Sequence, residues 1–248
     1  LRISALFLVP TLLRRLLALP DETLALLRSL RLLVSSGSAL HPEERRIIRT
    51  RICPGFIEYY SSTEGGGVSF LTAEDPDRFG ESVGRPVFAV DVQCVDENHN
   101  PLPVGKVGRV RYRGPAVADG FWNDADASKE AFRDGWFYPG DLGMLDEHGY
   151  LYLKGRSKDM IIRGGINIYP AEVEAVLQGH ASVADSAVVG WPSREFNEEV
   201  AAFVILKGAA TPAELRRLCR ERLAPYKVPR EVFVVNDFPR NALGKVIK

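Results

Sequence analysis

Cysteine is scarce in this chain, and its spacing excludes two classes of protein. The 248 residues include three cysteines, Cys53, Cys94 and Cys219, which lie far apart in the sequence. A disulfide framework needs paired cysteines, and a zinc site needs cysteine or histidine ligands at short spacing. We therefore expect neither a disulfide framework nor a clustered metal site, and we expect a protein of the reducing cytoplasm.

The chain also lacks an excess of one charge and a long apolar run. Lys and Arg number 32, and Asp and Glu number 32, so nothing indicates a surface for nucleic acid or for an anionic membrane. Pro10, Arg14 and Arg15 interrupt the apolar stretch of residues 1–19, which excludes a transmembrane helix and a signal peptide there. Because the first residue is Leu1 and not methionine, we expect a fragment of a longer protein.

The pattern of apolar residues changes twice along the chain. Residues 1–75 alternate helix and strand patterns, which is typical of an α/β fold. Residues 80–157 carry short strand patterns separated by turns, which predict a β-barrel or sandwich-like subdomain. Residues 158–248 alternate again and predict a small α+β domain. The expected domains are therefore residues 1–157 and residues 158–248.

Periodicity predicts the individual elements. The helices are expected at residues 12–19, 24–30, 171–178 and 212–223, with one more beginning at Pro42. The strands are expected at residues 32–34, 57–60, 90–95, 108–113, 136–138, 142–145, 150–153, 185–189, 200–206 and 232–235. Small polar residues follow the first two strands, at 35–38 and 61–67. Open α/β sheets bind ligands at the carboxyl edge of their strands, so these segments are candidates for a binding site.

Residues 155–174 form the most informative segment of the chain. Two short apolar runs flank Gly164 and Gly165, which predicts a tight β-hairpin, and Pro170 is placed to open a helix. Hairpin packing does not require Arg156, Lys158 and the other charged residues that crowd around these glycines. The segment therefore combines a structural turn with a candidate functional site.

Several short blocks, in a fixed order, carry a resemblance to a known family. They are residues 36–39 (SGSA), 60–64 (YSSTE), 138–141 (YPGD), 155–159 (GRSKD) and 239–245 (PRNALGK). In this order and spacing the chain resembles the adenylate-forming superfamily, which includes acyl-CoA synthetases, adenylation domains of peptide synthetases and firefly luciferase. The resemblance covers nearly the whole chain and implies the C-terminal half of a two-domain enzyme.

The resemblance implies an ATP-dependent ligase that joins a fatty or aryl carboxylic acid to coenzyme A. The acid attacks the α-phosphate of ATP to give an acyl-adenylate, and a thiol then attacks the acyl carbonyl. The implied cofactors are ATP, Mg²⁺ and coenzyme A, with the carboxylic acid as the partner substrate. A homodimer is compatible with this resemblance. The form of residues 164–174 (GGINIYPAEVE) looks closest to acyl- and aryl-CoA ligases.

Residue roles for the first half-reaction follow from the same resemblance. The implied nucleotide-binding residues are Gly37, Ser38, Ala39, Tyr60, Ser61, Thr63, Asp141, Arg156 and Lys245. Among these, Tyr60 would stack on adenine and Asp141 would bind the ribose. Thr63, Glu64 and Lys245 are implied as catalytic residues, with Glu64 holding Mg²⁺. The three glycines after Glu64 suggest a backbone kept close to a ligand.

Residue roles for the second half-reaction fall in the 155–174 segment. Lys158 matches the family's hinge between the large domain and a small mobile domain. Gly164 and Gly165 would line the path of the thiol arm, and Arg163 would contact coenzyme A.

Two departures from the family pattern stand beside nucleotide contacts. Ser61 replaces the usual glycine, and Pro139 replaces the usual threonine or serine. The glycine-rich phosphate loop that the family carries upstream is absent from this sequence, so we expect the isolated chain to be inactive. Two other functions remain open: acyl loading onto a carrier protein, and a non-catalytic binding fragment.

Overall fold

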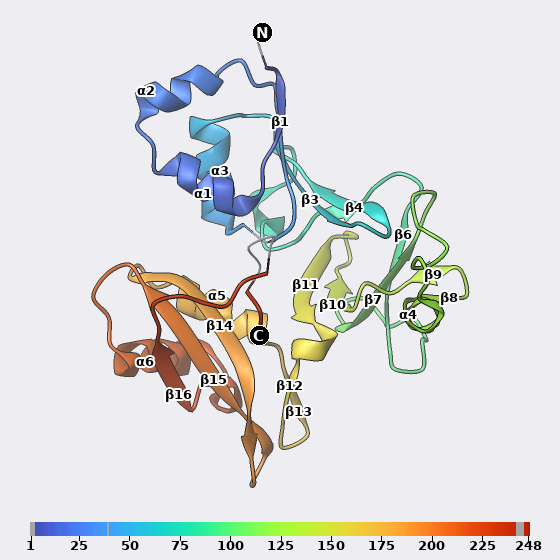
Figure 1. The fold of residues 1–248 in the computed structure, drawn as a ribbon, viewed down its shortest axis with the longest axis vertical. Helices are drawn as coiled ribbons and strands as arrows, with labels where there is room; N and C mark the ends of the chain where they lie inside the picture. The colour runs from blue at the N-terminus through green and yellow to red at the C-terminus, as the bar shows by residue number, and fades with distance from the viewer. Residues whose placement is uncertain (1–2, 39, 242–245) are drawn as a thin grey trace. The chain divides into compact units, whose positions relative to one another are not determined.

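The computed structural model describes residues 3–38, 40–241 and 246–248 (Figure 1). The chain divides into two compact units, Leu1–Leu153 and Lys154–Lys248. Within the described residues, all three cysteines are free and buried, which confirms that they form no disulfide. No described helix has the length and apolar character needed to cross a bilayer.

The first unit begins with a mixed sheet whose strands follow the order β1-β2-β3-β4-β5. Strands β1, β2 and β3 are parallel, whereas β4 and β5 are antiparallel additions. The strands are β1 (Ala5–Phe7), β2 (Leu32–Ser35), β3 (Phe56–Ser62), β4 (Gly66–Leu71) and β5 (Arg85–Pro86). The helices are α1 (Pro10–Leu17), α2 (Asp21–Leu24) and α3 (Pro42–Arg51), with short 3-10 turns η1 (Ala25–Leu27) and η2 (Asp77–Phe79).

Alternation along the strands explains how the helices pack on this sheet. Leu33 and Phe56 point to one face, where they meet Leu13 of α1 and Ile48 of α3 in a single cluster of fully buried side chains. The predicted α/β character of residues 1–75 is therefore confirmed. The helix expected at residues 24–30 is shorter, because α2 ends at Leu24 and continues only as the 3-10 turn η1.

A second sheet of six strands follows, in the order β11-β10-β7-β9-β8, with β6 pairing with the other edge of β7. Its strands are β6 (Asp91–Val95), β7 (Gly108–Arg113), β8 (Phe132–Arg133), β9 (Trp136–Phe137), β10 (Asp141–Leu145) and β11 (Leu151–Arg156), with helix α4 (Ala125–Ala131) beside them. The sequence predicts a β-barrel or sandwich-like subdomain here, and among the described residues this sheet is open and does not close into a barrel. Strands β8 and β9 have two residues each, which is too short for the ladder that closure requires.

The second unit is a sheet covered by two helices. The strand order is β13-β12-β15-β14, with β16 pairing with β15. The strands are β12 (Ile161–Arg163), β13 (Ile166–Ile168), β14 (Val183–Ser193), β15 (Asn197–Leu206) and β16 (Glu231–Val234). The helices are α5 (Pro170–Gln178) and α6 (Pro212–Arg222), with turns η3 (Ser157–Asp159) and η4 (Pro225–Lys227). This arrangement confirms the predicted α+β character.

The hairpin predicted around the paired glycines is confirmed. Ile161 faces Ile168 and Arg163 faces Ile166 across the antiparallel pair. Gly164 and Gly165 have φ values of 56° and 81°. Two successive positive φ angles are the signature of a type I′ turn, which strongly favours glycine. The chain then enters α5 at Pro170, as expected.

Candidate functional site

The carboxyl ends of β2 and β3 bring small polar side chains together in the first unit. These strands are parallel neighbours, so both end at the same edge of the sheet. The Ser36 and Ser61 hydroxyls lie 2.9 Å apart and share a hydrogen bond. Gly37 follows with φ of 105°, and both Gly37 and Ser38 are exposed. The expected gathering of polar groups at this edge is therefore present in the structure.

Asp141 joins this edge from the second sheet. It is the first residue of β10, is 9% exposed, and follows Gly140, whose φ is 80°. Its carboxylate accepts a hydrogen bond of 2.5 Å from the Tyr60 hydroxyl. Two residues that are 81 positions apart in the chain, both assigned from the sequence to one nucleotide site, are thus in direct contact. A carboxylate has about four acceptor positions, which suits this side chain to bind the hydroxyl groups of a ligand.

The turn between β3 and β4 carries Thr63 and Glu64. The Ser62 hydroxyl accepts the Gly65 N–H at 2.9 Å, and the Glu64 carbonyl accepts the Ala118 N–H at 2.8 Å. These bonds hold the turn at both ends. Thr63 is exposed and Glu64 is half-buried, so both side chains are accessible at this edge.

Tyr112 of β7 explains the first glycine after Glu64. A Cβ at position 65 would overlap the Tyr112 ring, so the glycine is required by packing within the protein. Packing thus gives the first of the three glycines a reason within the protein, beside the expected approach of the backbone to a ligand. The Tyr112 hydroxyl also lies 2.8 Å from the Ser62 hydroxyl. Burial, with the nearby charges of Glu64 and Asp141, raises the pKa of the Tyr112 hydroxyl to about 12. This hydroxyl therefore stays protonated at physiological pH.

Sequence reasoning missed Tyr112 because nothing in the sequence separates it from an ordinary core residue. It occupies one of the alternating inward positions of β7 and is fully buried. An aromatic residue at such a position is typical of any packed sheet. Only the tertiary contact with the 62–65 turn reveals that it supports the site.

The Glu64 carboxylate is the one proposed metal ligand. It makes no hydrogen bond or ion pair with any residue that the structure describes. No cluster of three or more His, Cys, Asp or Glu suited to a metal occurs within the described ranges. Mg²⁺ commonly binds through one or two carboxylates together with substrate phosphates. A lone accessible carboxylate therefore fits a magnesium ion that arrives with a nucleotide.

In the second unit, Arg163 lies at the centre of a charged cluster. Its guanidinium donates to both carboxylate oxygens of Glu199, at 2.7 and 3.0 Å, and sits 4.1 Å from the centre of the Phe196 ring. Arg230 approaches the same carboxylate at 3.6 Å. The Gly164 N–H donates to the Phe196 carbonyl at 2.8 Å. These contacts tie the glycine turn to the β14–β15 hairpin.

An open groove of about 700 Å³ surrounds this cluster. Its lining residues are Arg163, Phe196, Glu199, Arg216, Arg220, Pro225, Val228, Arg230 and Glu231. Arginines outnumber glutamates here, and a guanidinium fork matches the geometry of a phosphate. The groove can therefore hold an anionic ligand that also offers an aromatic or apolar part. Of its members, only Arg163 was identified from the sequence, since the others come from the segment 196–199, from α6 and from residues 225–231 and converge only in the fold.

The Arg163–Glu199 pair gives this unit a pH dependence. The hydrogen bonds from Arg163 hold the pKa of Glu199 below its ordinary value, although burial opposes them. Because the pKa of Glu199 is lower in the folded than in the unfolded chain, its ionised carboxylate stabilises the fold at pH values above the unfolded pKa of about 4.3. This contribution is lost as the pH falls through the folded pKa. We expect Glu199→Gln to destabilise the unit by about 2 kcal/mol at pH 7, with a smaller difference from wild type in acid.

Chemical denaturation at pH 7 and at pH 3 tests this expectation. Glu221→Gln serves as the matched control, because Glu221 pairs with Arg217 on the exposed surface of α6. If Glu199→Gln lowers the free energy of unfolding by the same amount at both pH values, the pH dependence does not come from the Arg163–Glu199 pair.

The remaining predicted residues are distributed as follows. Arg156 ends β11 and Lys158 lies in the turn η3, and both are exposed side chains of the second unit. Gly164 and Gly165 are exposed at the tip of their hairpin. Ala39 and Lys245 lie outside the described residues. Among the predicted site residues, the structure brings the side chains of Tyr60 and Asp141 into direct contact, and the Ser61 hydroxyl bonds to Ser36 at the same edge.

A profile of the AMP-binding enzyme family matches residues 1–122, and a profile of the AMP-binding enzyme C-terminal domain matches residues 172–245. An indoleacetate–CoA ligase of Aromatoleum aromaticum is 38% identical over 251 residues, covering 100% of this chain and 49% of the relative. The medium/long-chain-fatty-acid–CoA ligase FadD8 of Mycobacterium tuberculosis is 36% identical over 255 residues, covering 98% and 45%.

Solved structures agree with these relatives. The ATP-bound MatB structure from Rhodopseudomonas palustris has a TM-score of 0.90 and 34% identity, and the match covers 99% of this chain and 49% of that one. The chain spans about half the length of the relatives it matches.

Proposed function

Because the chain belongs to the AMP-binding, or adenylate-forming, enzyme family, we propose that it is the C-terminal half of a carboxylic acid–coenzyme A ligase. The observation that carries this proposal is the contact between Tyr60 and Asp141 at the carboxyl edge of β2 and β3. An aromatic ring beside a buried carboxylate suits a nucleoside, since the ring stacks on a base and the carboxylate accepts ribose hydroxyls.

The first half-reaction forms the acyl-adenylate. A carboxylate oxygen of the acid attacks the α-phosphorus of ATP, and the bond to pyrophosphate breaks. We assign Thr63 to the α-phosphate, Glu64 to Mg²⁺ and Lys245 to the negative charge that develops between the acid and the phosphate. When bound, Mg²⁺ neutralises charge on the phosphate oxygens. The accessible positions of Thr63 and Glu64 at the sheet edge support these roles.

The second half-reaction transfers the acyl group to a thiol. The thiolate sulfur attacks the acyl carbonyl, AMP leaves, and the thiol proton is released. Gly164 and Gly165 form an exposed turn without side chains, which leaves room for a thin pantetheine arm. The arginines of the adjoining groove, Arg163 and Arg230 among them, supply cations for the phosphates of coenzyme A.

Lys158 and Arg156 complete the proposed assignment. Lys158 lies in η3, four residues after Lys154, the first residue of the second unit. A few residues at the end of an element suffice to absorb the φ/ψ change of a domain rotation. We assign Lys158 to such a hinge and Arg156 to the nucleotide.

Pyrophosphate release tests the proposal. The protein encoded by the complete reading frame should release pyrophosphate in the presence of ATP, Mg²⁺ and a suitable carboxylic acid, and should form acyl-CoA when coenzyme A is added. Short-chain, medium-chain, long-chain and aromatic acids should be compared. We expect the isolated 248-residue chain to show no measurable turnover, because the phosphate loop of the family is not in this sequence.

Coenzyme A dependence separates the competing functions. A ligase accumulates free acyl-CoA in proportion to added coenzyme A, whereas an enzyme that loads a carrier protein releases little. Titration of the isolated chain with AMP in a calorimeter distinguishes a nucleotide-binding half-site from an inert fragment. Turnover by the isolated chain, or a complete protein that uses no acid in the panel, would overturn the corresponding part of the proposal.

A further inference from the structure

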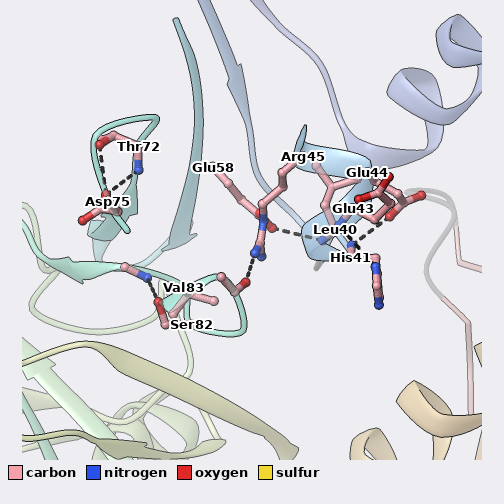
Figure 2. A network of polar contacts seen from close by, with 12 residues as sticks. Leu40, His41, Glu43, Glu44, Arg45, Glu58, Thr72, Asp75, Ser82 and Val83 are labelled. Carbon is pink, nitrogen blue, oxygen red and sulfur yellow. Dashed lines mark hydrogen bonds and ion pairs between the residues drawn. The ribbon is translucent and has the colours of Figure 1, made fainter. Parts of the chain in front are cut away.

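A buried ion pair lies beneath the candidate nucleotide site in the first unit. Arg45 of α3 and Glu58 of β3 are each 4% exposed, and the Arg45 Nε donates a hydrogen bond to Glu58 Oε2. Figure 2 shows Glu58 between Arg45 and the backbone of Leu40. Isolated buried charges are costly, so a pair in this position must satisfy its remaining donors and acceptors.

Both partners also bind backbone groups of other segments. The second carboxylate oxygen of Glu58 accepts the Leu40 N–H at 3.1 Å. Arg45 Nη1 donates to the Gly80 carbonyl. The pair therefore fixes four segments at once: the loop after β2, helix α3, strand β3 and the turn that ends at Gly80. Charge-assisted hydrogen bonds of this kind are about twice as strong as neutral ones.

The position of Glu58 connects this pair to the candidate site. Glu58 and Tyr60 are two residues apart on β3, so their side chains project from the same face of the strand. Leu40 follows the loop that contains Gly37 and Ser38 and directly precedes His41, the N-cap of α3. The Glu58 carboxylate thus binds the end of that loop to the strand that carries Tyr60.

The helix itself is fixed independently of the pair. His41 and Glu44 form a capping box: His41 Nδ1 accepts the Glu43 N–H, and the Glu44 carboxylate accepts the His41 N–H (Figure 2). Stability alone therefore does not require a buried charge in this place. Buried ion pairs are often less stabilising than apolar residues of similar volume, and their best-attested use is to specify one arrangement.

We propose that Glu58, held by Arg45, is a positioning residue for Gly37 and Ser38, the candidate nucleotide-binding residues that precede Leu40 in the chain. Its carboxylate fixes the Leu40 N–H, which sets the loop against Tyr60 before any ligand binds. This inference rests on the proposed adenylation function and adds a specific source of preorganisation to it. Neither residue touches the reacting atoms in this assignment, so both act through the loop.

The test separates positioning from folding by using two variants of the complete protein. The double variant Arg45→Met/Glu58→Leu replaces the pair with apolar side chains, removes the acceptor for Leu40 and leaves no unpaired charge. We expect its melting temperature to match or exceed wild type, its KM for ATP to rise about tenfold, and its KM for coenzyme A to stay unchanged. Glu58→Gln keeps an oxygen for the Leu40 N–H but leaves Arg45 unpaired. We expect a lower melting temperature and a KM for ATP near wild type.

If the pair only stabilises the fold, the order of the two variants is reversed. Glu58→Gln, the less stable variant, then has the higher KM for ATP. Arg46→Met is the matched control, because it breaks the exposed Arg46–Glu43 pair on the same helix. A double variant with the wild-type KM for ATP overturns the inference.

Hydrogen exchange at the Leu40 amide gives an outcome that does not depend on activity. In the 248-residue chain, exchange should be slow in wild type and in Glu58→Gln and at least tenfold faster in the double variant. Unchanged exchange in the double variant also overturns the inference. If exchange responds as expected while wild type fails to use ATP, the adenylation function is wrong and the loop contact stands.

Discussion

Replacing Lys245 with alanine should slow acyl-adenylate formation by about 10²–10³-fold, because removing one donor aimed at developing charge typically costs that much. The attack of a carboxylate on ATP concentrates negative charge between two anions, and a cation that bridges them stabilises the transition state more than the ground state. The thioester step has no such requirement. Thioester formation from a supplied acyl-adenylate should therefore stay within about threefold of wild type.

The two half-reactions are measured separately. Pyrophosphate release without coenzyme A reports adenylation, and acyl-CoA formation from synthetic acyl-adenylate reports thioester formation. Lys248→Ala is the matched control, since it removes a lysine three positions away that pairs with Glu174 at 2.6 Å. Equal losses in both half-reactions of Lys245→Ala would refute a role confined to adenylation.

Asp141→Asn should weaken ATP binding by about 100-fold, measured as KM for ATP and as the Kd for AMP. Hydrogen bonds to a charged group contribute about 1.5–3 kcal/mol each, and Asp141 is assigned to the ribose hydroxyls. Asparagine keeps the size of the side chain and one oxygen for the Tyr60 hydroxyl, but it replaces the second acceptor with a donor. The loss should therefore appear in nucleotide binding and not in the KM for coenzyme A.

Tyr60→Phe separates the two partners of this contact. The variant keeps the ring for stacking and removes the hydroxyl that donates to Asp141, so its effect on nucleotide binding should stay below about tenfold. Thermal denaturation of both variants shows whether either change disturbs the fold. A Tyr60→Phe loss as large as that of Asp141→Asn would mean that Asp141 acts mainly by holding Tyr60.

The extent to which sequence predicted structure differs between the two units. In the second unit, the hairpin at Gly164 and Gly165 and the helix beginning at Pro170 were predictable, because turn chemistry and helix starts are encoded within a few residues. In the first unit, strand positions were predictable, but whether the second sheet closes into a barrel was not. Closure depends on pairing between distant edges, which local patterns do not encode.

The candidate site shows the same division. Tyr60 and Asp141 were identifiable from short motifs, and the structure adds that their side chains meet. Tyr112 and Glu58 carry no motif, since a buried tyrosine and a strand glutamate resemble ordinary residues until their partners are known. The glycine at position 65 was identified from the sequence, but its packing against the distant Tyr112 ring was not.

Local sequence patterns were therefore sufficient to identify the family and to predict most of the element order, because both are encoded in residues close together in the chain. The tertiary structure alone decided which side chains support those residues. Glu58 binds the Leu40 N–H across 18 positions, and Arg163 binds Glu199 across 36. Such contacts depend on burial and on the register of paired strands, which arise only when the whole sheet is assembled.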